Sequence, residues 1–217
     1  MSYLTRDNAA EAIRRMKSFH DDIVGLYQKH GMDLLDNLGR RNIVMSQAQE
    51  KYFAQVLSDS YAGVEADGKT GQPDIVIASL GRELECKLTT RNKGGAISLQ
   101  TDFETLNQKG SLDYLYVIAD ESFKKFAVLH FIDLCTDDFR PVSNGSRGKV
   151  GMKKYEGMKK CNVLIGNALC INDMNVQKWS SRLGSATTPS REKMIREKIK
   201  YWNETPSKYR FELEEVC

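Results

Sequence analysis

The sequence predicts an α/β fold of the α+β kind, with a central mixed β-sheet flanked by helices. Apolar residues recur at helical spacing near the start of the chain. Runs rich in β-branched and aromatic residues follow in its middle. The predicted order of these middle elements is strand, strand, helix, strand, strand, which is typical of a mixed sheet with helices packed on it.

Two amphipathic helices are expected first. Apolar residues recur every three or four positions from about Asn8 to Lys29, with Asp7 as a candidate N-cap and Gly31 as a stop. A second helix is expected from about Ser46 to Ser58, with Ser46 as its N-cap.

The remaining elements are a hairpin, a helix, two strands, a basic helix and a last strand. We place them at 72–77 with 82–88, Ser98–Lys109 ended by Gly110, Tyr114–Ala119, Phe126–Phe131, Ser190–Trp202 and Lys208–Val216. For the basic helix, Ser190 after Pro189 is the expected N-cap.

Length and composition indicate one globular domain over residues 1–217, or one domain with a small appendage. Within it we expect an N-terminal helical region at 1–45, a catalytic core at 46–135 and a DNA-contacting and C-terminal region at 136–217. The net charge of +3 is compatible with a polyanion-binding surface without singling one out. Five cysteines without a CxxC pair favour a reducing, cytoplasmic location. The three histidines are too scattered for a zinc site, and no apolar run is long enough to cross a membrane.

The hairpin brings charged residues together. Strand side chains alternate between faces, so Glu85 and Lys87 share one face of the second strand, and Asp74 lies near the beginning of the first strand. A turn centred on Ser79-Leu80 sets Asp74 across from Glu85, whereas a turn centred on Leu80-Gly81 sets it across from Lys87. Both registers bring the three side chains together.

Two carboxylates and an ammonium on one face are typical of nuclease chemistry. Asp74 and Glu85 can hold a hard cation such as Mg²⁺ through their oxygens, and Lys87 reaches the same face. The alternative is an exposed hairpin whose charges are only solvated.

The Pro73-Asp74…Glu85-x-Lys87 pattern resembles the PD-(D/E)xK nuclease superfamily, over about the central third of the chain. The resemblance implies a restriction-endonuclease-like core and Mg²⁺-assisted hydrolysis of DNA that leaves 5′-phosphates. It assigns Asp74 and Glu85 as metal ligands with the backbone carbonyl of Cys86, and Lys87 as the group that positions or deprotonates the attacking water.

In this family an acidic residue of a preceding helix often assists the metal, directly or through water. Glu50 stands where that helix is expected, and we include it among the candidate catalytic and metal-binding residues. Glu65 and Asp67, in the loop that follows, are its competitors for this role.

Basic residues follow the catalytic strand and fill a later segment. We expect DNA contacts from the loop after the strand and from residues 140–160, which carry seven lysines and arginines, four glycines and one acid. The candidates are Arg91, Lys93, Arg147, Lys149, Lys153 and Lys154. The alternative for residues 140–160 is a flexible, solvated loop.

Within the superfamily, a chain of this size best fits a type II restriction endonuclease that cleaves double-stranded DNA. The resemblance implies a homodimer and a cognate DNA methyltransferase as genetic partner. Two other functions stay open: a structure-selective nuclease of the resolvase or repair type, and a non-catalytic DNA-binding module.

Overall fold

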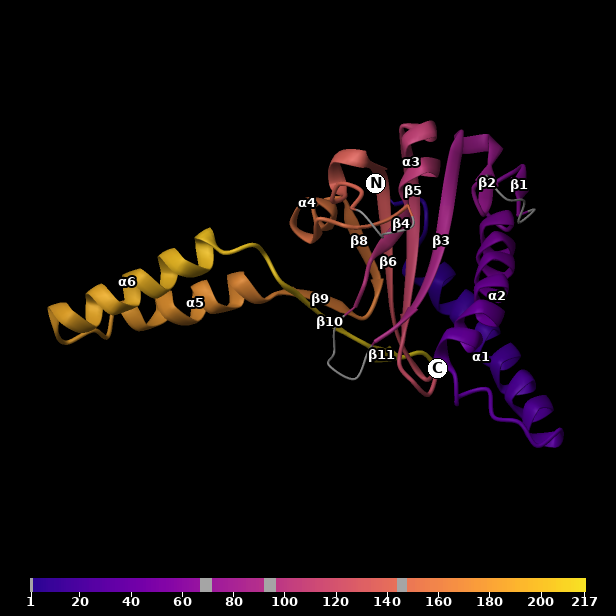
Figure 1. The fold of residues 1–217 in the computed structure, drawn as a ribbon, viewed down its shortest axis with the longest axis horizontal. Coiled ribbons are helices and arrows are strands. Elements are labelled where there is room, and N and C mark those ends of the chain that lie inside the picture. The colour runs from indigo at the N-terminus through magenta and orange to yellow at the C-terminus, as the bar shows by residue number, and fades with distance from the viewer. Residues whose placement is uncertain (1, 67–71, 92–96, 144–147) are drawn as a thin grey trace. The chain divides into compact units, whose positions relative to one another are not determined.

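The computed structural model describes residues 2–66, 72–91, 97–143 and 148–217 (Figure 1). The predicted fold class is confirmed, because a mixed sheet lies at the centre with helices against it. The helices are α1 (Arg6–Lys29), α2 (Leu38–Ser58), α3 (Phe103–Lys109), α4 (Lys154–Met158), α5 (Ile171–Leu183) and α6 (Pro189–Glu204). Within the described residues, none of them combines the length and apolar character needed to span a membrane.

The main sheet of the described residues has the order β1-β2-β3-β5-β6-β11, and β8 also pairs with β6. These strands are β1 (Val64–Glu65), β2 (Ile75–Ile77), β3 (Arg82–Thr90), β5 (Ser111–Ala119), β6 (Lys125–Cys135), β8 (Cys161–Ile165) and β11 (Glu214–Glu215). The sheet is mixed because β3 and β5 are parallel while its other neighbours are antiparallel. Two further pairs join β4 (Gln100–Asp102) to β7 (Lys149–Gly151) and β9 (Asn167–Cys170) to β10 (Tyr209–Glu212).

The main core lies between α1, α2 and one face of the sheet (Figure 1). Leu84 and Cys86 of β3 are buried in it, while the intervening Glu83, Glu85 and Lys87 are only partly buried. This alternation is the one expected for a strand with one apolar face. The charged residues of β3 therefore lie on the face away from the main core.

The small β4–β7 sheet contacts residues of that other face. The hydroxyl of Tyr116 donates to the Gln100 carbonyl oxygen over 2.9 Å, and the Tyr114 hydroxyl lies 2.8 Å from Thr101 Oγ1. Tyr114 and Tyr116 are the strand partners of Glu85 and Lys87, so two tyrosines lie beside the charged pair on the neighbouring strand.

Two predicted helix starts were wrong. Helix α1 is capped by Thr5, whose side chain accepts from the Asn8 N–H, so Asp7 lies in the first turn rather than at the cap. Helix α2 begins at Leu38 under an Asn37 cap, about two turns before Ser46, because Asn37 accepts from the Arg40 N–H.

Two later elements also differ from expectation. The helix predicted over Ser98–Lys109 is divided, because Asp102 accepts from the N–H groups of Glu104 and Thr105 and starts α3 only after the short β4 strand. Helix α6 is capped by Thr188 rather than Ser190, with Pro189 at its first position.

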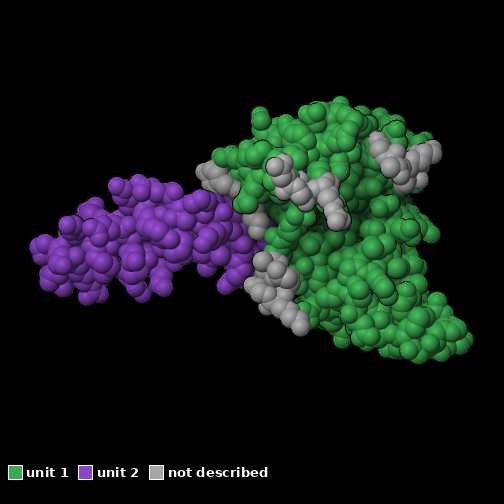
Figure 2. Space-filling view, in the orientation of Figure 1, with its two compact units in different colours: residues 1–166, 213–217 green, residues 167–212 purple. Residues whose placement is uncertain are grey.

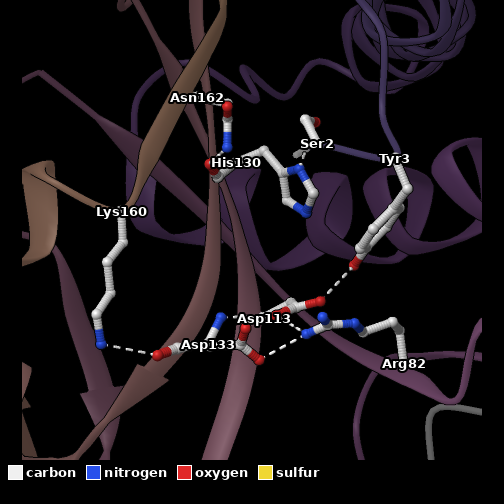
Figure 3. A network of polar contacts seen from close by, with 8 residues as sticks. All are labelled: Ser2, Tyr3, Arg82, Asp113, His130, Asp133, Lys160 and Asn162. Carbon is white, nitrogen blue, oxygen red and sulfur yellow. Dashed lines mark hydrogen bonds and ion pairs between the residues drawn. The ribbon is translucent and has the colours of Figure 1, made fainter.

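A buried polar network fixes the start of β3 (Figure 3). The Asp113 carboxylate, 2% exposed, accepts from the Tyr3 hydroxyl over 3.0 Å and from the Asp133 N–H over 2.9 Å, and Arg82 lies 3.4 Å away. Arg82 also donates to Asp133 over 2.5 Å. Residues from β3, β6 and the N-terminal segment thus contact one carboxylate of β5. These contacts hold the beginning of β3, next to the hairpin turn, in place.

The described chain divides into two compact units, which Figure 2 colours separately. Unit 1 comprises residues 1–166 and 213–217 and contains the main sheet, and unit 2 comprises residues 167–212. The sequence did not indicate where the chain divides. In unit 2, Asn172 joins α5 to the segment after α6, because its side chain donates to the Trp202 and Thr205 carbonyls and accepts from the Lys208 N–H.

Candidate active site

The site is built on the β2–β3 hairpin. Ile75 pairs with Leu84, Val76 with Glu83, and Ile77 with Arg82. Extending this register by one residue sets Asp74 opposite Glu85, which is the first of the two alternatives considered from the sequence. The turn is a short 3₁₀ segment, Ala78–Leu80, followed by Gly81 in the left-handed region at φ 59°.

Asp74 lies immediately before β2 and covers the neighbouring edge of β3. Its Oδ2 accepts a hydrogen bond from the Cys86 backbone N–H over 2.6 Å, in the place of the strand partner that β2 no longer supplies. Within a strand, the N–H and C=O of one residue point to the same edge, so the Cys86 carbonyl is directed to the edge that Asp74 occupies. Burial raises the pKa of the Cys86 thiol, which keeps it protonated and leaves the main chain as the ligating part of this residue.

Glu85 and Lys87 form an ion pair, with side chains 13% and 32% exposed. Burial by itself lowers the pKa of Lys87, but the charge and hydrogen bond of Glu85 outweigh burial and raise it above its usual value. Lys87 is therefore an ammonium at neutral pH.

Glu50 on α2 belongs to the same electrostatic cluster. Burial first, and then the charges of Asp74 and Glu85, raise the pKa of Glu50 to about 7. Burial and the charge of Glu85 raise the pKa of Asp74 to about 6, against the opposing effects of the Cys86 N–H and Lys87. Of the competitors to Glu50, Glu65 is exposed in β1 and Asp67 lies outside the described residues.

Two buried side chains fix α2 beside the sheet and so position Glu50. The adjacent Gln49 donates to the Leu115 carbonyl oxygen over 3.1 Å. Two turns earlier, the fully buried guanidinium of Arg41 donates to Thr90 Oγ1 over 2.6 Å and to the Glu121 carbonyl oxygen. The helix therefore cannot slide along the strands without breaking buried hydrogen bonds.

A cavity of about 730 Å³ opens at Glu50 and Asp74. The residues that line it with them are Ile43, Ser46, Gln47, Lys51, Ala54 and Ala66. Most of these belong to the exposed side of α2, and the sequence reasoning missed them. Their signal is spacing, because Ile43, Ser46 and Gln47 precede Glu50 by seven, four and three residues and so share its helix face.

The donor set suits a hard cation. Three carboxylates and a main-chain carbonyl supply oxygen ligands. The pKa values of Glu50 and Asp74 are raised first by burial and then by the charge of neighbouring carboxylates, and a bound cation would offset both effects. Among the residues that the structure describes, however, no three His, Cys, Asp or Glu side chains are already gathered as a metal-binding cluster. Glu85 is engaged with Lys87 and Asp74 with the Cys86 N–H, so a metal must compete with both contacts.

The predicted DNA-contacting residues are distributed unevenly. Arg91 follows β3, where its N–H donates to the Ala119 carbonyl oxygen over 3.2 Å. Lys149 is exposed in β7, and Lys153 Nζ donates to the Asp137 carbonyl oxygen over 2.8 Å. Lys93 and Arg147 lie outside the described residues, as does the side chain of Lys154.

The described part of the 140–160 segment is folded rather than a continuous loop. It contributes β7 and α4, and its Val150 and Met152 are 3% and 4% exposed. The main-chain N–H of Met152 donates to the Leu99 carbonyl oxygen over 2.8 Å. This packing presents Lys149 and Lys153 from an ordered surface of unit 1.

Comparisons with protein-family models, with curated proteins and with solved structures found no match to this chain.

Proposed function

We propose that the protein is a Mg²⁺-dependent endodeoxyribonuclease of the type II restriction kind, which hydrolyses double-stranded DNA to 5′-phosphate ends. The observation that carries the proposal is the position of Asp74 opposite Glu85, which pairs with Lys87, and within electrostatic reach of Glu50. Of these residues, Glu50 and Asp74 line a cavity of about 730 Å³. Acidic and basic groups with perturbed pKa values at a concave surface are typical of catalytic sites.

Each residue has a part in the proposed reaction. Asp74, Glu85, Glu50 and the Cys86 carbonyl would hold Mg²⁺, which when bound supplies charge neutralisation at the phosphate. Lys87 remains protonated because Glu85 raises its pKa, so we assign it to orienting the attacking water and to stabilising charge on the phosphate oxygens. Tyr114 and Tyr116 are the neighbours of Glu85 and Lys87 on β5 and border the ion pair on that side.

A second copy and a cellular context complete the proposal. We propose a homodimer, because two symmetric sites cut the two strands of a palindromic sequence, and a cognate DNA methyltransferase that protects the host DNA. We also propose a cytoplasmic location, which the five free cysteines support.

The test is digestion of genomic and plasmid DNA with Mg²⁺ or with EDTA, followed by sequencing of the fragment ends. We expect cleavage only with the metal, and a shared sequence at the ends. Cutting that depends on branched structure without a shared sequence would instead identify a structure-selective nuclease. No cutting with Mg²⁺, on methylated and unmethylated DNA alike, would overturn the enzyme proposal and leave a binding module.

The hairpin offers a matched pair of variants for this test. Glu85→Gln and Lys87→Ala alter the proposed catalytic ion pair, and we expect each to lower the cleavage rate by about 10²-fold or more. Glu83→Gln and Lys109→Ala alter a second ion pair, which joins the same hairpin to α3 with Nζ and Oε1 2.9 Å apart, and we expect near wild-type cleavage. Equal losses in both sets would show that the hairpin acts through stability and not through chemistry.

A further inference from the structure

The positive charge of the chain is concentrated in unit 2. Residues 167–212 contain nine lysines and arginines against five aspartates and glutamates, a net charge of +4. The rest of the chain contains twenty-three against twenty-four, a net charge of −1. The excess that gives the chain its net +3 therefore lies outside the unit that carries the candidate active site.

One face of α6 combines exposed cations with exposed apolar groups. We call Arg191, Met194, Lys198 and Tyr201 the α6 flank, because their spacing of three, four and three residues aligns them along one side of the helix. Met194 and Tyr201 are 41% and 56% exposed, and Arg191 and Lys198 are exposed as well. The buried face of the same helix is marked by Ile195, 1% exposed.

The cations of the flank are not neutralised by the helix itself. The ion pairs of α6 among the described residues join Arg196 to Glu192 over 2.7 Å and Lys200 to Glu204 over 3.8 Å, and none of them includes Arg191 or Lys198. No carboxylate occupies a position of the flank. Two unpaired cations on a net-positive unit favour a polyanion as partner and disfavour a second copy of the same unit, which would repel it.

The dimensions of the flank match those of a nucleic acid backbone. The ten helical steps from Arg191 to Tyr201 rise about 15 Å along the helix, the length of about four base-pair steps. Lysine and arginine neutralise phosphates, while Met194 between the two cations and Tyr201 beyond Lys198 can contact the sugars that separate those phosphates.

We propose that the α6 flank is a DNA-backbone-binding surface, so that unit 2 holds double-stranded DNA independently of the metal. The choice of DNA as the polyanion rests on the proposed nuclease function. The flank supplies affinity without reading sequence, because its contacts are to phosphate and sugar. It also explains how the protein would hold DNA although unit 1, which carries the candidate active site, has no excess of positive charge.

The test measures binding in the absence of cleavage. The full chain carrying Asp74→Asn is titrated in EDTA against a fluorescein-labelled 30-base-pair duplex, with anisotropy as readout over a series of KCl concentrations. In this background, Arg191→Gln with Lys198→Gln is compared with Arg196→Gln with Lys200→Gln, which removes the same charge from the same helix. Far-UV circular dichroism checks that all variants keep their helices, as expected for surface substitutions.

We expect the flank variant to bind about tenfold more weakly near 100 mM salt, with a slope of log K against log salt reduced by about 2, since each lost phosphate contact removes about 0.9. The control should lose less than about threefold. Tyr201→Ala should weaken binding without changing the salt slope. Equal losses in the flank variant and the control would overturn the assignment to the flank, as would tighter binding to an RNA duplex or to anionic phospholipid vesicles.

The result separates this inference from the proposed function. Flank-dependent binding of the duplex, by a wild-type protein that cleaves neither genomic nor plasmid DNA with Mg²⁺, would support the inference and overturn the nuclease. Cleavage by the wild-type protein, together with duplex binding that the flank substitutions leave unchanged, would support the nuclease and overturn this inference.

Discussion

At the residue scale, Arg41 is the buried cation on which the position of α2 depends. Its guanidinium donates to the Asp120 and Glu121 carbonyl oxygens and to Thr90 Oγ1, and it lies 5.0 Å from the centre of the Phe123 ring. A lysine cannot reproduce this planar fork of donors, so the carbonyl groups would lose partners in the interior. Arg41 thus connects α2, the helix of Glu50, to the end of β3.

We expect Arg41→Lys to lower the free energy of unfolding by about 3 kcal/mol, because several buried hydrogen bonds to a charged group are lost together. Urea denaturation measures the change. The exposed neighbour provides the control, since Arg40→Lys should change stability by less than about 0.5 kcal/mol. Equal effects of the two substitutions would show that the buried hydrogen bonds of Arg41 do not fix the position of α2.

The raised pKa of Glu50 gives a second residue-scale expectation. A carboxyl group whose pKa is about 7 in the folded chain binds more protons than the same group in the unfolded chain between about pH 4 and 7. Its contribution to stability therefore falls as pH rises through that window and is unfavourable above it. Asp74, with a pKa of about 6, acts in the same direction.

In EDTA, Glu50→Gln should raise the thermal midpoint at pH 8, and the gain should shrink at pH 5, where the wild-type carboxyl is protonated. Scanning calorimetry at the two pH values measures both. Glu65→Gln, which changes an exposed acid in β1, should have no such pH-dependent effect. A gain that is the same at both pH values would show that the charge of Glu50 is not its cause.

At the element scale, two glycines test whether local backbone geometry holds the hairpin and helix in shape. Gly81 ends the hairpin turn at φ 59°, and Gly25 lies within α1; an added Cβ would meet no atom within 4 Å at either position. Gly81→Ala should therefore cost about 1 kcal/mol through left-handed strain alone, whereas Gly25→Ala should add about 0.5–1 kcal/mol. Chemical denaturation of both variants measures these opposite signs, and a neutral Gly81→Ala would contradict the turn geometry.

The elements also show how far the sequence could reach. The hairpin was accessible because alternating Leu84 and Cys86 define a face and Gly81 limits the turn, which left two possible registers for the structure to decide between. The early start of α2 was not, because an Asn37 cap followed by Leu38 and Gly39 carries no apolar repeat, and burial of Arg41 is decided only by its distant carbonyl partners. Tertiary contacts, and not local preference, determine such boundaries.

The candidate site shows the same limit. Asp74, Glu85 and Lys87 are close in sequence, so strand periodicity alone brings them together. The proximity of Glu50 to the hairpin depends on how α2 packs on the sheet. Helical spacing places Ser46 and Gln47 on the face of Glu50, but that this face borders a cavity is known only once the packing is known. The grouping of residues close in sequence was predictable, whereas the contacts that α2 makes with them were not.

At the scale of the whole molecule, two units of very different core size share one chain. In unit 2, the described hydrophobic residues that are fully buried are Ile195 and Phe211, whereas unit 1 contains the large core between α1, α2 and the sheet. A small core gives low local stability, so the two units should not unfold as one cooperative system.

We expect Ile195→Ala to cost unit 2 about 2–4 kcal/mol of local stability. Hydrogen exchange followed by mass spectrometry should then show faster exchange over residues 167–212, with unchanged protection in β5 and β6. Met194→Ala, at an adjacent exposed position, should leave both regions protected. Loss of protection in β5 and β6 together with unit 2 would show that the units fold as one.

The hydrogen bond from the Cys86 N–H to Asp74 has a consequence for aggregation. Immediately before β2, this carboxylate covers the edge of β3, and an uncovered strand edge is a template on which other chains can add. Removing the side chain would therefore uncover this edge as well as remove a proposed metal ligand, so precipitation of Asp74→Ala would not test the proposed chemistry. Asp74→Asn keeps an oxygen that can accept from the same N–H, so it separates solubility from activity.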